Sequence, residues 1–295
     1  MKTAIAAVLA LLASFCFALG SLIQQSAARK TPGRALRLGL LVTLVREERW
    51  LGGMALTVFS FGIQAAALAF GPLALVQPLA TIDVLFALPL IARLNRRPLT
   101  SRSIAGGLCV AAGMTVFVAI SPPTSGIGTP GITMWIPALA AIALLTVASG
   151  VTALRASGTA RVILLAATAA VIYGVLDALT KSTVDMLPQR GVGVLTTWEP
   201  YALLVAGILA SLFGQSAFNA GPLSLSLPVV DTVEPATAVV LAIVVFHESL
   251  ARTPLHLSVQ LLGAASAVTG IILLSHSGVV LAEDRRESSP EASAG

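Results

Sequence analysis

Three acidic residues stand inside long apolar runs of the sequence, where a carboxylate is costly. Asp83 lies in the run 72–92, and Asp231 and Glu234 lie in the run 222–246. An ionisable group at bilayer depth costs about 2.5–3.5 kcal/mol even on lenient insertion scales, so such groups are seldom retained without a use. Asp231 and Glu234 are three residues apart and share a helix face. Carboxylates gathered at one depth favour a bound cation or shared protons, which is transporter chemistry.

Further polar residues of the apolar runs could line the same cavity. They are Gln24, Gln25, Gln64, Gln215, Asn219 and Asp177. Two purely structural roles are alternatives to a role in binding. Amides and protonated acids often only tie helices together, and Asp177 is followed after four residues by Lys181, so the two could form an ion pair at the membrane edge. The sequence has no nucleophile elbow, Walker A loop or H-E-x-x-H motif, so we predict no catalytic residues and no cofactor.

The composition excludes a water-soluble domain. Of the 295 residues, 56% are hydrophobic and only 11% are charged, whereas soluble domains carry about 25% charged residues. Two cysteines are too few for a disulfide framework. A nucleic-acid partner would need a basic face with interleaved aromatic residues, which is not present. The composition therefore predicts an all-α, polytopic membrane protein whose main partner is the lipid bilayer.

Nine apolar runs are long enough to cross a membrane as helices. A crossing needs roughly 20 mostly apolar residues, because the hydrocarbon core is about 30 Å thick. The runs are 3–25, 51–70, 72–92, 104–120, 133–152, 162–181, 199–219, 222–246 and 257–275. The stretch 35–46 is short and basic and is expected to lie in the headgroup region; if it spans, the count becomes ten. The first run could also be a cleaved signal peptide, although its apolar part is longer than that requires.

The distribution of Lys and Arg predicts the orientation of the spans, since basic residues gather in cytoplasmic loops. With nine spans, most fall on one side, in the linker 28–49, the loop 93–102, the connection 155–161 and the tail 278–295. The other side has only Lys2, Lys181, Arg190 and Arg252. This pattern predicts a protein of the cell membrane with its N-terminus outside and its C-terminus in the cytoplasm.

A repeat relates the two halves of the chain. The segment 71–78 (GPLALVQP) recurs as 221–228 (GPLSLSLP), and each copy follows a run that opens near a tryptophan, Trp50 or Trp198. Because an odd number of spans separates equivalent helices, the halves must be inverted in the membrane. Inverted repeats are a common build of secondary transporters, whose sites lie near the midplane where the halves meet.

The repeat predicts an inverted 4+1+4 arrangement of helices. Pro78 and Pro228 occupy matching positions, and each removes a backbone donor, so we expect both to break their helices beside the site unless they are packing kinks alone. The expected divisions are 1–120 for the first repeat with its basic interfacial linker 28–49, 121–160 for an outer loop and connector helix, 161–277 for the second repeat, and 278–295 for a disordered cytoplasmic tail.

About residues 10–275 resemble the NIPA-type magnesium transporters, a branch of the drug/metabolite transporter superfamily, which includes EamA-like proteins. The resemblance is carried by Gly20-Ser21, the basic linker, Trp50, Phe70-Gly71-Pro72, Leu75-Val76-Gln77-Pro78-Leu79, the Asp177/Lys181 span and Asn219. The chain departs from the family in having no acid between Leu51 and Phe70, and Asn95-Arg96-Arg97 where Asn-Glu-Arg is common. The resemblance implies nine spans, an outside N-terminus and Mg²⁺ transport.

We therefore expect a transporter that moves a small cation by alternating access. Mg²⁺ is the first choice, as a substrate held by Asp83, Asp231 and Glu234, since it prefers oxygen ligands including one or two carboxylates. The alternative is a proton-coupled exporter of a small organic metabolite or drug. A membrane-embedded lipid enzyme and a non-transporting scaffold are further alternatives. The small residues of the spans permit a homodimer without requiring one.

Overall fold

The computed structural model is all-helical over the residues that it describes. These are 2–31, 36–70, 79, 82–94, 98–119, 127, 129–247 and 254–276. The helices are α1 (Lys2–Ala28), α2 (Leu38–Leu44), α3 (Glu48–Phe70), α5 (Asp83–Leu94), α6 (Ser101–Ala119), α7 (Ile132–Arg155), α8 (Gly158–Arg190), the 3-10 helix η1 (Gly191–Thr196), α9 (Glu199–Ala220), α10 (Leu223–Val244) and α11 (Pro254–Ser275). Helix is the expected structure, because a chain in lipid must satisfy its backbone groups internally. Pro78 and the tail 278–295 lie outside the described residues.

Each expected span overlaps a described helix, but α5, which overlaps the expected span 72–92, has only 12 residues. Six described helices, α1 and α7 to α11, are long and apolar enough to cross a membrane, and the apolar part of α6, Ser101–Phe117, is shorter. Helix α8 has 33 residues and extends beyond the expected 162–181 at both ends. Helix α2, within the basic stretch 35–46, has only seven residues. Seven residues rise about 10 Å, one third of the hydrocarbon core, so α2 is too short to cross it.

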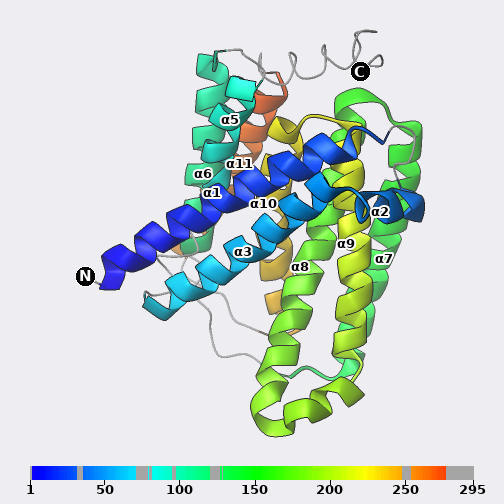
Figure 1. Ribbon diagram of the computed structural model, residues 1–295. Helices are drawn as coiled ribbons and strands as arrows, with labels where there is room; N and C mark the ends of the chain where they lie inside the picture. The colour runs from blue at the N-terminus through cyan, green and yellow to red at the C-terminus, as the bar shows by residue number, and fades with distance from the viewer. Residues whose placement is uncertain are drawn as a thin grey trace.

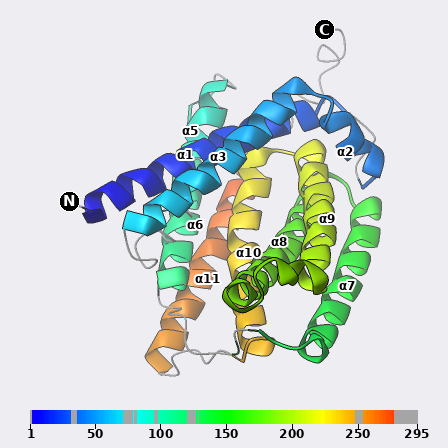
Figure 2. The ribbon, with the colours of Figure 1, turned by 60° about the horizontal axis from the view of Figure 1, so that its bottom comes forward.

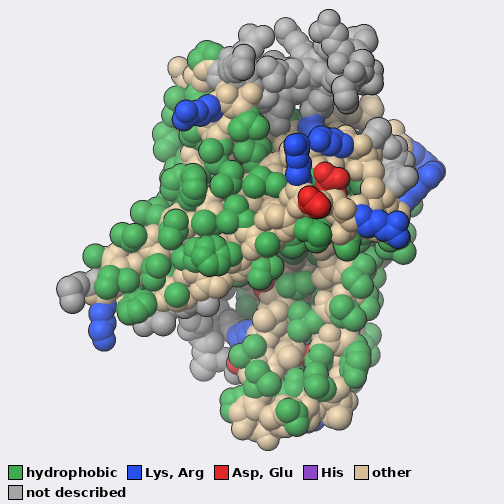
Figure 3. Space-filling model, viewed as in Figure 1, with side chains coloured by type: hydrophobic (Ala, Val, Ile, Leu, Met, Phe, Trp, Pro, Cys, Tyr) green, Lys and Arg blue, Asp and Glu red, His purple; other side chains and the backbone are tan. Residues whose placement is uncertain are grey.

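The outer surface of the helices is apolar. Large side chains such as Leu144, Leu204 and Leu262 are 65–72% exposed. Figure 3 shows hydrophobic side chains over most of one face, while most of its charged side chains gather over α2, the beginning of α3 and the end of α5. Soluble monomers rarely expose so much contiguous apolar surface, so these faces are made to contact lipid.

Helix α8 is the centre of the larger bundle. It packs along α7, α9 and α10, while α1 packs along α3 and α5. Figures 1 and 2 show the α1–α3 hairpin running obliquely across the bundle of α7 to α10. The first helix of each predicted half, α1 or α8, therefore packs against the second and third helices of its own half.

Glycines allow the fourth helices of the two halves to meet closely. Helices α6 and α11 pack along each other, with Gly106 opposite Gly270 and Gly113 opposite Gly263. A Cβ atom at Gly113 would lie 2.5 Å from the Gly263 carbonyl oxygen, and one at Gly270 would lie 2.6 Å from that of Gly106. Because the higher number on one helix meets the lower number on the other, the two helices are antiparallel. The spacing between the glycines is the same on both.

The expectation that Pro228 breaks its helix is wrong. The helix is continuous from Leu223 to Val244 and includes both Pro228 and Pro235. A proline lacks the N–H that would bond to the carbonyl four residues earlier, so Pro228 removes only the bond to the Ser224 carbonyl. Pro228 itself accepts a hydrogen bond from the Thr232 hydroxyl at 2.8 Å, which helps the second turn to remain helical.

Candidate functional site

The first acidic pair joins α5 to α10. Asp83 is the first residue of α5 and is 2% exposed. Its Oδ1 accepts a hydrogen bond from the Val84 backbone N–H at 2.9 Å, and its carboxyl group lies within hydrogen-bonding range of that of Asp231. The second oxygen of Asp231, Oδ2, is buried and has no hydrogen-bond partner within the described part of the chain.

The second acidic pair joins α8 to α10. The Asp177 carboxyl group lies within hydrogen-bonding range of that of Glu234, and Asp177 is exposed while Glu234 is half-buried. Gly174, one turn before Asp177, brings the helices together, because a Cβ atom there would lie 2.9 Å from the Glu234 carbonyl oxygen. The Lys181 ammonium lies 4.6 Å from the centroid of the Phe246 ring, a cation–π geometry.

Together the two pairs form a line of four carboxyl groups, which we call the carboxyl chain: Asp83, Asp231, Glu234 and Asp177. Asp231 and Glu234 are also close enough to interact electrostatically with each other, so α10 connects the pairs. The chain runs from a sealed end at Asp83 to an accessible end at Asp177. A hydrogen bond between two carboxyl groups needs a proton on one of them, so this arrangement can hold protons.

The expected three-carboxylate Mg²⁺ site is not assembled in this arrangement. Asp83 and Asp231 meet, but Glu234 pairs with Asp177 instead. Among the described residues, no group of three or more His, Cys, Asp or Glu side chains is placed to hold a metal ion. Each of these carboxyl groups lies closest to another carboxyl group, so a divalent ion would first have to separate the pairs.

Two residues of this site, Pro235 and Tyr173, were not identified from the sequence. Pro235 directly follows Glu234 and lies four residues after Asp231, so its missing N–H removes the helical partner of the Asp231 carbonyl. Its signal was the motif 231–235, DTVEP. Tyr173 lies one helical turn before Asp177 and within electrostatic reach of Glu234. A tyrosine four residues before a membrane aspartate was the available signal.

A second polar region, which we call the amide network, ties α1 and α3 to α9. The Trp50 indole N–H donates to Gln215 Oε1 at 3.0 Å, and Gln215 Nε2 donates to Gln24 Oε1 at 2.8 Å. Gln24 Nε2 then donates to Thr57 Oγ1 at 2.8 Å, and the Thr57 hydroxyl donates to the Gly53 carbonyl at 3.1 Å. Every side chain of this network is neutral.

Asn219 and Gln25 extend the contact between the halves at the same end of α9. Asn219 Nδ2 donates to the carbonyls of Ala28 and Thr31, at 2.6 and 2.9 Å, and so satisfies carbonyls at the end of α1. Gln25 Nε2 donates to the Gly221 carbonyl at 3.1 Å. The predicted binding residues Gln215 and Asn219 thus hold helices together.

Gln64 does not join the amide network. It is half-buried on α3, two helical turns beyond Thr57, which corresponds to about 10 Å along the helix. Trp50, rather than Gln64, is the α3 residue that contacts Gln215. The sequence prediction that Gln64 and Gln215 line one cavity therefore finds no support in the contacts made by Gln215.

The apolar helices and their buried acids define a helical, multi-pass membrane protein. The chain is 27% identical over 246 residues to a protein of Corynebacterium glutamicum named only as uncharacterized, covering 83% of this chain and 85% of that protein. No family model matches the chain. No solved structure matches it either. The shared length indicates that the similarity covers most of the chain and is not limited to one motif.

Proposed function

We propose that this chain is a secondary transporter that binds a small cation at the carboxyl chain and alternates access between two inverted halves. The observation that carries the proposal is the pairing of four carboxyl groups across α5, α8 and α10. Like-charged groups held this close together cannot all be ionised without a compensating cation. A structural role would be met by a neutral side chain at lower cost, as the amide network does.

Protons are the cation that the pairing favours. Asp83 already accepts a backbone N–H, so Asp231 is the natural donor of the bond between them. Its Oδ2 remains open as an acceptor. In such a state each pair holds one proton, and loss of that proton leaves two adjacent negative charges. This repulsion can separate α10 of the second half from α5 of the first, which couples proton release to movement of the halves.

Mg²⁺ remains the second candidate, as the resemblance to NIPA-type transporters implies. Once deprotonated, the carboxyl chain offers hard oxygen ligands, and Pro235 leaves the Asp231 carbonyl available as one more. Mg²⁺ is often bound through one or two carboxylates with several waters. An exchange of protons for Mg²⁺ at the same carboxyl groups would make both ions part of one cycle. Export of a small organic solute driven by protons is the alternative.

The packing of the helices supports the inverted repeat. Helices α1 and α8 occupy matching positions in their halves, and α6 meets α11 in an antiparallel crossing where Gly106 faces Gly270 and Gly113 faces Gly263. Such exchanged pairing is what a two-fold relation between equivalent helices produces. The basic linker between α1 and α3 supports a cytoplasmic placement of that end, with the N-terminus outside the cell membrane.

The test is flux into proteoliposomes that contain the purified chain. We expect the wild type to move protons, Mg²⁺ or both, recorded with pH- and Mg²⁺-sensitive dyes inside the vesicles. Asp83→Asn and Asp231→Asn should each lower the flux at least tenfold, about 1.4 kcal/mol in barrier terms. Asp185→Asn is the matched control, since Asp185 is an exposed aspartate of α8 outside the carboxyl chain. Equal flux in all three variants would contradict the proposal.

A further inference from the structure

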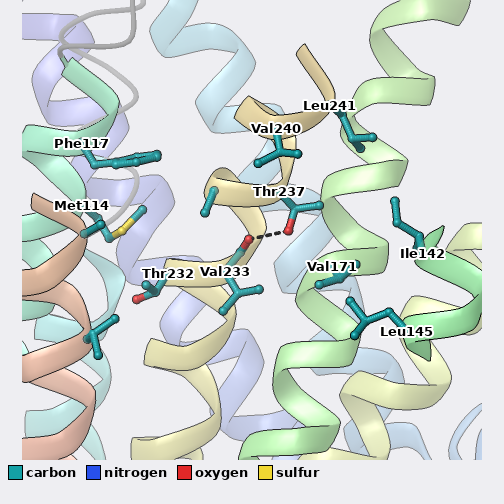
Figure 4. A pocket seen from close by; sticks show the side chains of 13 residues that line it. Met114, Phe117, Ile142, Leu145, Val171, Thr232, Val233, Thr237, Val240 and Leu241 are labelled. Atoms are coloured by element: carbon teal, nitrogen blue, oxygen red, sulfur yellow. Dashed lines mark hydrogen bonds between the residues drawn. The ribbon is translucent and has the colours of Figure 1, made fainter. Parts of the chain in front are cut away.

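An apolar groove separates α7 from the α6–α11 pair, with α10 as its floor. Its volume is about 450 Å³, within the range of about 300–1,000 Å³ that is typical of small-molecule sites. Figure 4 shows Met114 and Phe117 of α6 on one side and Ile142 and Leu145 of α7 on the other. The lining residues lie in the middle turns of α7 and α11 and in the last two turns of α6.

The lining of the groove offers nothing to a polar ligand. Among the described residues that line it, none has a charged side chain, and the two with hydroxyl groups are Thr232 and Thr237. Thr232 donates to the Pro228 carbonyl and Thr237 to the Val233 carbonyl, each at 2.8 Å. Both hydroxyl protons are therefore used within α10. A polar ligand would lose hydrogen bonds to water there without regaining them, so the occupant must be hydrocarbon.

The groove opens sideways, toward the bilayer. Leu145 on α7, Val240 on α10 and Val268 on α11 all line it and are 53%, 55% and 50% exposed. These residues belong to candidate membrane spans, so what surrounds their exposed sides is lipid. An acyl chain is the hydrocarbon that a bilayer supplies at that depth.

From these features we infer that the groove binds one phospholipid acyl chain, which packs between α7 and α11 and against α10. Asp231 and Glu234 of the carboxyl chain flank Thr232 and Val233, which line the groove, and Thr237 of the groove lies one helical turn after Glu234. The bound chain therefore packs on α10 beside the acids, and a lipid in the groove holds α10 in the position where the acids meet α5 and α8. The inference concerns binding and does not rest on the proposed transport.

The first test compares two neighbouring substitutions in α11. Ala264 lines the groove, whereas Ala265 is exposed next to it and does not. In native mass spectrometry of the purified full chain with palmitoyl-oleoyl phosphatidylglycerol, we expect the wild type and Ala265→Phe to retain one lipid. Ala264→Phe fills the groove with its ring and should retain at least tenfold less. Equal retention by the two variants would overturn the inference.

A second measurement needs no substitution, so it holds even if the phenylalanine variants fold poorly. The wild-type chain is placed in vesicles of the same lipid with a small fraction carrying a photoactivatable diazirine in the acyl chain. Labelling should concentrate on groove residues such as Met114 and Val240, above the level found at Leu204 of α9, which is 65% exposed. Labelling in proportion to exposure alone would show general lipid contact and would refute a specific site.

Discussion

Two polar regions of this membrane protein solve the same problem in opposite ways. The amide network around Gln215 joins neutral donors to neutral acceptors, with hydrogen bonds of 2.8–3.0 Å between the side chains. The carboxyl chain joins four acids to one another, which only works when protons or another cation are present. Both regions connect α9 or α10 of the second half to helices of the first half.

We interpret the amide network as a structural contact and the carboxyl chain as the proposed cation-binding site. A neutral network is complete without any ligand, so it can hold α1, α3 and α9 together in one arrangement. A line of carboxyl groups has two arrangements, paired when protonated and repelled when ionised, so it can respond to a gradient. Asp231 Oδ2 has no partner among the residues that the structure describes, which marks the carboxyl chain as the incomplete region of the two.

The largest expected effect comes from neutralising one acid in each pair. Asp83→Asn combined with Asp177→Asn should lower coupled flux about 100-fold, because each pair contributes about a factor of ten, or 1.4 kcal/mol. The counterpart in the amide network, Gln24→Leu with Gln215→Leu, should leave the flux per folded molecule within about twofold. Proteoliposome flux, scaled to the amount of folded protein, measures both. A reversed order would exchange the roles that we assign to the two regions.

Substitutions in the amide network should instead lower the stability of the protein. Gln215→Leu leaves the Trp50 indole N–H and one acceptor of Gln24 unpaired, so the free energy of unfolding should fall by about 1–3 kcal/mol. Unfolding in mixed micelles, followed by tryptophan fluorescence, gives this value. The Trp50→Phe variant and the double variant complete a cycle, and a coupling energy near zero would contradict a direct contact.

Pro235 sharpens the comparison because it lies inside the working site. Pro235→Ala restores a backbone N–H to the Asp231 carbonyl, and a proline in a helix interior is up to about 3 kcal/mol less favourable than alanine. We expect unfolding to become harder by on the order of 1 kcal/mol, while flux decreases. Pro137→Ala in α7, where the proline is also inside a helix, should leave flux unchanged. A loss of flux in both variants would point to a general effect of rigidity.

The smallest effect is expected at the end of the amide network. Thr57→Val removes the acceptor of Gln24 Nε2 and keeps the size of the side chain. Single interhelical hydrogen bonds in membranes are worth about 0.6 kcal/mol on average, so stability should fall by about that amount. Thr152→Val is the control, because the Thr152 hydroxyl bonds only within α7. A larger loss would mean that the network is cooperative.

The sequence was sufficient for the helices and for the presence of the acids. Apolar runs give the helices because lipid leaves the backbone no other partner, and a carboxylate in such a run is conspicuous. The partners of those acids could not be obtained, since they depend on which helices meet. Asp177 was therefore open to two interpretations, a place in the site or an ion pair with Lys181, and only the approach of α10 puts its carboxyl group beside that of Glu234.

The role of the amide side chains could not be predicted from the sequence for a related reason. Gln215 and Asn219 are as suitable for a binding site as for a structural bond, and only the approach of α1 and α3 decides between these roles. Pro228 was wrongly expected to break its helix, because a proline in the second turn removes one hydrogen bond without ending the helix. Pro235 was overlooked although its position, four residues after Asp231, has the more direct consequence for the acids.

The most direct test of the central claim is the infrared absorption of protonated carboxyl groups in the lipid-free, detergent-purified chain. At neutral pH the account predicts a protonated-carboxyl band that shifts in D₂O, fades as the pH rises, becomes weaker in Asp231→Asn and is unchanged in Asp185→Asn. Absence of that band from the folded wild type at neutral pH would mean that the acids are ionised there, and would contradict the pairing on which the proposal depends.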